Sequence, residues 1–503
     1  MNRTEVLKKF KHHGLIAIKA YGLLPLEADE TVLSRYLALR ESAKMVKKLG
    51  PGRKISHAHA IQVAIDHLAQ QTDYLDGNRL EWAMEAQFAH DTPREWSVAE
   101  YTLQIEQDST EIGLAIFKEG RKLKSVPKAV RGDRYNEAME TVKQLRAQVS
   151  RLRIGLLEGF ITSGEMFPLA DIQNLLRLPI VRALFTKMIW RNNAGEMGLL
   201  DADQMMLMDV DGEAYPVGDA IGLAHPYHLY QAQKLGAWQK YMVHHRIVQP
   251  IKQAFRELYI LTPAEKATYR YSNRFVGHAL AGRMVAQLLA GRGWRMNDHY
   301  NHATPYKQFG DIRAVFRLMG VWSYLGREGA PTTSDQIYFE PNNLHKKRTW
   351  RSESFEEEWL PLETIPPLIF SEVMRDADLV VSVAQKEDGQ YLSKEAYLAR
   401  EQLITTLIDD LGLPNVRVDG HFAYVTGKLA DYRVHLGSAV IHIEPGNYLC
   451  IVPDTWGKSH EKLFLPFVDE RDKKISEVIS KILLLLADDK IKDESILWQI
   501  RRK

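Results

Sequence analysis

The sequence has a single cysteine and no long hydrophobic run. One cysteine, Cys450, excludes an intramolecular disulfide and an all-cysteine metal site, and its place in an apolar strand run predicts a small buried side chain. The longest apolar run, residues 482–487, is far shorter than the ~20 residues that cross a bilayer. The basic N-terminus lacks the apolar core and the cleavage site of a secretory signal. These absences predict a soluble, cytoplasmic protein with no membrane partner.

Charge is nearly balanced over the whole chain, with a formal net charge of +2. So small a net charge gives no global field that would draw the chain to nucleic acid or to an anionic membrane. Residues 1–60 are an exception, because they contain twelve Lys and Arg against five Asp and Glu, a net charge of +7 (12 − 5). This segment can serve as a nucleic-acid-binding surface. A solvated helical face explains the same charges, since few aromatic residues lie among them.

Familiar catalytic motifs are missing. The chain has no GxxxxGK[ST] phosphate loop, no GxSxG nucleophile elbow, no HExxH and no paired CxxC. The tetrapeptide DVDG at 209–212 resembles the start of a calcium loop, but the later ligands are absent, so a turn is expected there. Asp298, His299 and His302 have a spacing that can supply metal ligands, yet they lie in loop-like sequence. We predict no cofactor and no metal site.

The length of 503 residues is enough for about two to four domains, each with its own core. Helical and strand-like segments alternate without a regular βαβ rhythm, so the sequence predicts an α+β fold rather than a doubly wound sheet. The changes in pattern along the chain predict four parts: a helical region at 1–92, a central α+β domain of antiparallel sheet and helices at 93–325, a linker or long loop at 326–364, and a C-terminal α+β domain at 365–503.

Local periodicity in the first third of the chain predicts individual elements. Apolar residues recur on single helical faces between residues 30 and 90, and Asn78 is placed to cap one of these helices. Alternation of apolar and polar residues over 101–116 predicts a small antiparallel sheet. The spacing of apolar residues over 142–156 then predicts one long amphipathic helix.

Two further helices are expected in the middle of the chain. Pro250 stands near the first turn of a helix predicted over 249–261, and Pro263 can start another that continues to Gly291. Strand-like alternation follows over 312–318.

The stretch YRVHLGSAVIHIEPGNYLCIVPD at 432–454 predicts the strands of a domain core. Along an extended strand Arg433 and His435 share one face, and Ser438 and Glu444 follow within a short distance of chain. A guanidinium, an imidazole and a hydroxyl on one face can hold a phosphate or a nucleotide. We therefore take Arg433, His435, Ser438 and Glu444 as candidate catalytic residues. The solvent-facing side of a structural sheet explains the same residues.

Six stretches carry a resemblance to a known family, and they occur along the chain in the family's order. They resemble the molybdate-metabolism-regulator-like (MolR-like) proteins, a bacterial family of unknown biochemical function: RLEWAME (79–85), GRKLKSVPKAV (120–130), QPIKQAFRELY (249–259), GRGWR (291–295), the block at 432–454, and ISKILLLLADDKI (479–491). The resemblance implies a regulatory role connected with molybdate metabolism and supplies no catalytic residue to carry over.

Two features depart from known patterns. Some relatives in that family have a tryptophan-glycine-arginine nucleic-acid-associated domain, whereas the nearest triplet here is WGK at 456–458. His435-Leu-Gly437-Ser438 resembles the His-Gly-Ser of ADP-ribosyltransferases, but it contains an additional Leu, and Glu444 follows sooner than that family's catalytic glutamate.

Three functions are therefore in view. The first is a cytoplasmic regulatory or scaffold protein that binds a protein partner or a small ligand. The second is an enzyme that acts on a nucleotide or a phosphorylated group through Arg433, His435 and Glu444. The third is a nucleic-acid-binding protein that uses the basic residues 1–60. The sequence leaves the oligomeric state open.

Overall fold

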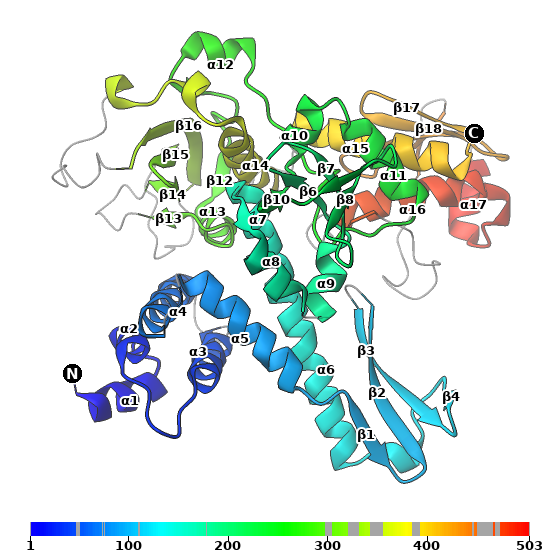
Figure 1. The fold of residues 1–503 in the computed structure, drawn as a ribbon. Coiled ribbons are helices and arrows are strands. Elements are labelled where there is room, and N and C mark those ends of the chain that lie inside the picture. Colours follow the sequence, from blue (N-terminus) through cyan, green and yellow to red (C-terminus); the bar gives the residue numbers. More distant parts are fainter. Residues whose placement is uncertain are drawn as a thin grey trace. The chain divides into compact units, whose positions relative to one another are not determined.

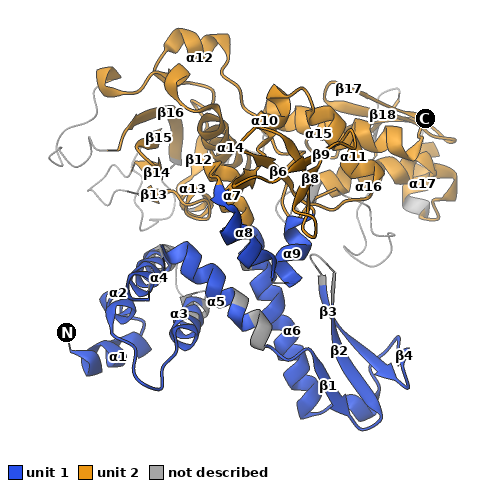
Figure 2. Cartoon of the chain, in the orientation of Figure 1, with its two compact units in different colours: residues 1–156, 167–186 blue, residues 157–166, 187–503 orange. Residues whose placement is uncertain are grey.

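The computed structural model describes most of the chain, and it confirms the α+β class. The described residues are 2–46, 51–72, 74, 76–108, 111–177, 179–296, 304–319, 331–342, 356–384, 393–444, 447–449, 466–467 and 473–501. They form two compact units, one of residues 1–156 and 167–186 and the other of residues 157–166 and 187–503 (Figure 2). The four parts predicted from the sequence stay a prediction.

The first unit begins with helices, as the apolar periodicity predicts (Figure 1). Ile61, Ile65 and Leu68, which recur on one face of a helix, are buried in a single core cluster with side chains from the neighbouring helices. The helices are α1 (Arg3–Lys11), α2 (Leu15–Leu23), α3 (Val32–Val46), α4 (Pro51–Gln71) and α5 (Gly77–Asp91).

Two local details explain how these helices meet and begin. Helices α2 and α4 approach so closely that a Cβ on Gly22 would lie 2.0 Å from the carbonyl oxygen of Ala64, so only glycine fits at that crossing. The predicted cap Asn78 is wrong: helix α5 is capped by Asp76, whose side chain accepts a hydrogen bond from the Arg79 backbone N–H.

A small antiparallel sheet completes the first unit with further helices, and it confirms the alternation over 101–116. Leu103 and Ile105 are buried on one face, while Gln104 and Glu106 are exposed. The strands and helices are β1 (Glu95–Val98), β2 (Tyr101–Asp108), β3 (Glu111–Lys118), β4 (Arg121–Lys122), η1 (Lys128–Val130), α6 (Asp133–Arg151) with the π-helical η2 (Leu152–Leu157), β5 (Phe167–Pro168), α8 (Leu169–Leu176) and α9 (Pro179–Phe185).

The second unit contains an antiparallel sheet in the order β10-β6-β7-β8-β9. Trp190, Leu200 and Ile221 of this sheet are buried, which ties the strands to the core of the unit. The elements of this part are α7 (Glu158–Ser163), β6 (Ile189–Asn192), β7 (Met197–Asp201), β8 (Met206–Met208), β9 (Ala214–Pro216), β10 (Ala220–Leu223), α10 (Pro226–Gln231) and α11 (Leu235–His244).

The helix predicted over 249–261 is wrong. Residues 245–262 are irregular backbone, yet Gln249, Gln253 and Arg256 are almost completely buried. Hydrogen bonds made by these side chains take the place of the backbone hydrogen bonds that would hold a helix. The Gln253 side-chain amide donates to the carbonyl oxygens of Ile189 and Ala224, both at 2.8 Å, and its oxygen accepts from the Ile189 N–H at 2.9 Å. The segment is therefore a buried connection held by polar side chains.

The single helix predicted from Pro263 to Gly291 is also wrong, because strands divide it into two helices. A second antiparallel sheet is formed here in the order β11-β16-β15-β14-β13, with β12 paired to β16. The elements are α12 (Pro263–Thr268), β11 (Tyr271–Ser272), β12 (Ala279–Ala281), α13 (Gly282–Ala290), β13 (Arg295–Met296), β14 (Pro305–Phe309), β15 (Ile312–Met319), β16 (Pro331–Pro341), η4 (Glu356–Glu358) and η5 (Leu362–Thr364).

The last part of the second unit follows the sequence pattern closely. Two helices, five antiparallel strands in consecutive order and a further helix follow the pattern of the sequence, whereas a last helix over 494–501 was not predicted. They are α14 (Pro367–Ala384), α15 (Lys394–Leu411), β17 (Val416–Asp419), β18 (Phe422–Thr426), β19 (Asp431–His435), β20 (Ile441–Ile443), β21 (Asn447–Leu449), α16 (Lys473–Leu486), η6 (Asp488–Lys490) and α17 (Glu494–Arg501).

Candidate functional site

The strands β17 to β21 form a sheet, here called the C-terminal sheet, of which β17 and β18 are labelled in Figure 1. Buried and more exposed residues alternate along its strands, so one face is buried and the other partly exposed. Helix α16 packs against β18 and β19, and Tyr432 and Val434 point into the core cluster there. Arg433 and His435 alternate with them, which confirms that the two predicted site residues share a face. We call that side the outer face, and its central side chains are those of Arg417, Phe422, Tyr424, Arg433, His435 and His442.

Cations and rings alternate across the outer face. Arg417, Tyr424, Arg433 and His442 lie directly opposite one another on four neighbouring strands. The Arg417 guanidinium carbon is 4.4 Å from the centre of the Tyr424 ring, and that of Arg433 is 5.3 Å from the centre of the Phe422 ring. Both distances are in the range of cation–π contacts, so these cross-strand neighbours stabilise the sheet and present aromatic surface.

A pocket of about 340 Å³ opens beside this row, at the lower end of the sizes found for small-ligand sites. Glu444, one of the four predicted site residues, lines it, and the Nε atom of Arg433 lies 3.1 Å from a Glu444 carboxylate oxygen. The lining residues are Pro414, Asn415, Val416, Arg417, Tyr424, Val425, Thr426, Asp431, Tyr432 and Glu444. The structure thus brings Arg433 and Glu444 together next to a cavity.

His435 and Ser438 form a second pair, away from that lining. Nδ1 of His435 accepts a hydrogen bond from the Ser438 backbone N–H at 3.1 Å and lies 2.8 Å from the Ser438 hydroxyl. Because a backbone N–H can only donate, Nδ1 is the acceptor and the proton of the neutral ring is on Nε2. Nε2 lies 3.0 Å from the Tyr397 hydroxyl, to which it donates. Both ring nitrogens are therefore engaged within the protein.

The surroundings of His435 favour its neutral form. Burial lowers the pKa of His435, and the neighbouring His421, His442 and Arg400 lower it further. Nη1 of Arg400 donates to the carbonyl oxygens of Leu436 and Gly437, at 2.7 and 3.1 Å. His435 and Arg400 together fix the turn that joins β19 to β20, which is a structural role.

Phe422 connects the two pairs of predicted residues. Its ring centre is 5.0 Å from that of His435, and the guanidinium of Arg433 lies over its face. The sequence analysis missed Phe422, Tyr424 and Tyr397. The alternation of Phe422 and Tyr424 with buried Ala423 and Val425 was the signal that could have found the first two.

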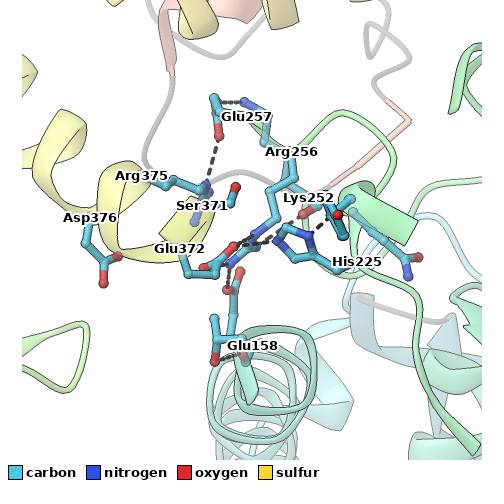
Figure 3. A network of polar contacts seen from close by, with 12 residues as sticks. Glu158, His225, Lys252, Arg256, Glu257, Ser371, Glu372, Arg375 and Asp376 are labelled. Atoms are coloured by element: carbon cyan, nitrogen blue, oxygen red, sulfur yellow. Dashed lines mark hydrogen bonds and ion pairs between the residues drawn. The ribbon is translucent and has the colours of Figure 1, made fainter. Parts of the chain in front are cut away.

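A larger polar network lies in the core of the second unit, and the sequence analysis missed it entirely (Figure 3). Its centre is a bidentate pair: Nε and Nη2 of Arg256 donate to the two carboxylate oxygens of Glu372, each at 2.7 Å, and both side chains are fully buried. Nη2 of Arg256 also donates to Glu158 of α7 at 2.9 Å. Burial alone would lower the pKa of Arg256, but Glu158 and Glu372 raise it well above its usual value.

His225 completes this centre. Its Nδ1 accepts from the Tyr227 backbone N–H at 3.1 Å and so caps α10, which places the proton on Nε2. Nε2 then donates to Glu372 at 3.0 Å. Burial lowers the pKa of His225, although the bond to Glu372 opposes that shift. Neutral His225 and ionised Glu372 are the states that this geometry favours.

The network continues along α14. Glu257 accepts from Lys252 and, at 2.9 Å, from Arg375. Burial would raise the pKa of Glu257, but these two cations outweigh it and hold the pKa far below its usual range. The next residue, Asp376, accepts from the Trp294 indole at 2.8 Å and from Lys307 at 2.9 Å, and lies 3.1 Å from Arg292. The network joins six separate segments of chain, and its central groups are enclosed by protein, which suits an architectural role.

The remaining predicted positions add no second site within the described residues. Lys234 donates to both Asp209 and Asp211, and the Gly212 N–H donates to the Asp209 carbonyl oxygen at 3.1 Å, so the DVDG tetrapeptide is the expected turn. Asp298, His299, His302 and Cys450 lie outside the described residues. Among the residues that the structure describes, no group of three or more His, Cys, Asp or Glu side chains is arranged to hold a metal ion.

Comparisons with known proteins give three partial family matches. Residues 120–294 match a domain of unknown function (DUF4132), residues 397–500 match another domain of unknown function (DUF7737), and residues 16–84 match a family of unknown function (DUF5724). No curated protein and no solved structure matches the chain. The second match contains the whole C-terminal sheet, and the first contains His225 and Arg256.

None of the helices within the described ranges has the length and apolar character needed to cross a bilayer.

Proposed function

We propose that this chain is a regulatory or scaffold protein that acts by binding a small ligand on the outer face of its C-terminal sheet. The observation that carries the proposal is the pocket beside Tyr424 and Glu444. Its position next to a row of aromatic and guanidinium groups gives it both apolar surface and polar partners for a ligand. The MolR-like resemblance of the sequence supports a bacterial cytoplasmic setting and a connection with molybdate metabolism.

A binding role accounts for the predicted residues better than an enzymatic one. Proton transfer by His435 would require a ring nitrogen that can reach a substrate, but Tyr397 and Ser438 engage both nitrogens. Nε of Arg433 lies 3.1 Å from a Glu444 carboxylate oxygen, so a phosphate would compete with Glu444 for the guanidinium. An enzyme that acts on a nucleotide remains the alternative, and turnover of any nucleotide would favour it.

Nucleic-acid binding through residues 1–60 has less support. Arg3 pairs with Glu27 at 2.7 Å, Lys9 pairs with Glu5 at 2.7 Å, and buried Arg35 pairs with Glu30. Side chains that already neutralise carboxylates release fewer counterions when a phosphate backbone approaches.

A thermal-shift screen on the full chain tests the proposal. The probes are nucleosides, nucleotides, amines, sugars and molybdate, each with the wild type and with a Tyr424→Leu variant. A ligand that binds only the folded state stabilises it by ~2.7 kcal/mol at a hundredfold excess over its Kd. We expect at least one probe to raise the melting temperature of the wild type and to lose that effect in Tyr424→Leu.

The matched control is Tyr230→Leu, which alters an exposed tyrosine of α10. The control variant should respond to the ligand as the wild type does. A screen without any shift, or a shift that Tyr424→Leu preserves, would contradict the proposal. A response to molybdate alone would support the metabolic connection directly.

A further inference from the structure

The charges around the pocket define the chemistry of a ligand. The lining contains one cation, Arg417, and two carboxylates, Asp431 and Glu444. Within the described part of the chain the lining therefore has a net charge of −1 (1 − 2), and beside it Arg433 pairs with Glu444 and Asp419 pairs with Arg417 at 3.0 Å. The site is therefore complementary to a cation.

Both arginines of this set are already neutralised. The Arg417 guanidinium has Asp419 and the Tyr424 ring as partners, and Arg433 has Glu444 and the Phe422 ring. A phosphate in the pocket would compete with Asp419 or Glu444 for one of these guanidinium groups and would lie close to the carboxylates of the lining. An anionic nucleotide is for this reason a poor match to the pocket.

Asp431, in contrast, is exposed at the start of β19, and its backbone is held by the sheet. Its carbonyl oxygen accepts from the N–H of Glu444, the residue after β20, at 2.9 Å, so the backbones of the two carboxylate-bearing residues of the pocket lie side by side. A cation between these carboxylates would make charge-assisted hydrogen bonds with both.

The aromatic rings of the outer face indicate which kind of cation fits the pocket. Tyr424 accepts a planar guanidinium at 4.4 Å over its face, supplied by the largely exposed Arg417 side chain. The guanidinium of a ligand can take the same place, because an exposed arginine is displaced at little cost. The size of about 340 Å³ restricts the ligand to a small molecule.

From these observations we infer that the pocket between Tyr424, Asp431 and Glu444 binds a small organic cation that bears a guanidinium or an amine. The inference rests on the proposed function and supplies its ligand class. The carboxylates of Asp431 and Glu444 hold the cationic group, and the Tyr424 ring covers it.

Titration calorimetry on the full chain tests this ligand class. The cationic probes are agmatine, arginine amide and putrescine, and the contrasting probes are adenosine and AMP. We expect the cations to bind, with agmatine tighter than putrescine because only a guanidinium stacks on the ring. Their affinity should fall as salt is raised, since the pairing is partly exposed to solvent.

Two isosteric variants distinguish a direct contact with the ligand from long-range electrostatic attraction by the surrounding charges. Asp431→Asn should weaken agmatine binding by about tenfold or more, because one charge-assisted hydrogen bond is lost. Asp409→Asn removes an exposed carboxylate of α15 that does not line the pocket, and it should change the affinity by less than about twofold. Glu444→Gln gives a second lining variant, and melting curves without ligand show that each variant is folded.

The outcomes distinguish the ligand class from the proposed function. If adenosine or AMP binds in a Tyr424-dependent manner and the cations do not, the ligand class is wrong and the proposed function stands. If the cations do not bind at millimolar concentration, or bind equally well to Asp431→Asn, the inference is overturned whatever the wider screen gives.

Discussion

Glu372 is the residue on which most of the buried polar contacts of the second unit converge. It accepts two hydrogen bonds from Arg256 and one from His225 while its own side chain is fully buried. Burial would raise the pKa of Glu372, but Arg256 and His225 together hold it well below its usual value. A charge in such a place is stable only while its partners remain, so its replacement exposes how much the network matters.

The change Glu372→Gln keeps the size of the side chain and removes the charge. Arg256 then stays buried, and Glu158 is the carboxylate that still balances its positive charge. We expect a loss of about 3–5 kcal/mol in the free energy of unfolding, the usual cost of breaking a buried pair from one side. Urea denaturation followed by tryptophan fluorescence measures it.

Glu444→Gln is the matched control, because it removes the same group from the half-exposed pair with Arg433. The expected loss there is no more than about 1 kcal/mol. Equal denaturation midpoints for the two variants would show that the buried pair contributes no more than an exposed one.

At the scale of an element, residues 245–262 show how a buried segment without regular structure is held. Gln253 bridges β6 and the end of β10, since it bonds Ile189 on both its N–H and its C=O and reaches Ala224 as well. Gln249 in turn donates to Gln253 at 2.8 Å and accepts from the Ala254 N–H at 3.0 Å. The side-chain amides of Gln249 and Gln253 thus make the hydrogen bonds that backbone groups make in a regular helix or strand.

Gln253→Leu should therefore destabilise the second unit well beyond the loss of one side-chain contact. The Ile189 N–H and the Ala224 carbonyl lose their partner while they stay buried, at a cost on the order of 3 kcal/mol in unfolding free energy. Thermal melts of the variant measure the loss. Gln231→Leu, on the exposed side of α10, is the control and should change stability by less than about 0.5 kcal/mol. A Gln253→Leu melt that matches the control would contradict this account of the segment.

The same segment shows which features of the structure could not be predicted from the sequence. The strands at 101–118 and the buried–exposed alternation of β19 were predictable, because a period of two is a local property of the chain. The helix over 249–261 was predicted wrongly, since the bonds that replace it come from residues such as Ile189 and Glu372, 64 and 116 positions away from their partners. The candidate site divides in the same way: alternation could place Arg433 and His435 on one face, whereas the pairing of His435 with Tyr397 of α15 depends on tertiary packing.

At the scale of the whole molecule, the buried titratable groups give the chain a predictable response to acid. Burial lowers the pKa of several histidines of the second unit, and for His228 it lowers the pKa to about 4. The others with lowered pKa values are His225, His278, His435 and His442. Asp378 has the opposite sign, because burial raises its pKa. Among the residues that the structure describes, these five histidines thus act against Asp378 in the mildly acidic range.

The sign of the effect follows from proton linkage. A histidine whose pKa is depressed in the folded state binds more protons when it is unfolded, so the free energy of unfolding rises with pH through that range. The contribution of these histidines to the free energy of unfolding should be fully present above about pH 6.5. It should fall toward pH 4, by at most about 1.4 kcal/mol per pH unit for each such histidine. Acid therefore weakens the fold before the ion-paired carboxylates Glu257 and Glu372, with their low pKa values, begin to take up protons.

The variant His228→Gln removes the contribution of one histidine to this pH dependence of the free energy of unfolding. Nδ1 of His228 accepts from the His225 backbone N–H at 3.0 Å in a capping box, and a glutamine oxygen makes the same bond at this helix position. The variant should match the wild type above about pH 6.5, show a shallower loss of stability between pH 6.5 and 4, and be the more stable protein near pH 4, as measured by urea denaturation at a series of pH values. A slope identical to that of the wild type would show that His228 carries its proton in the folded state as readily as in the unfolded one.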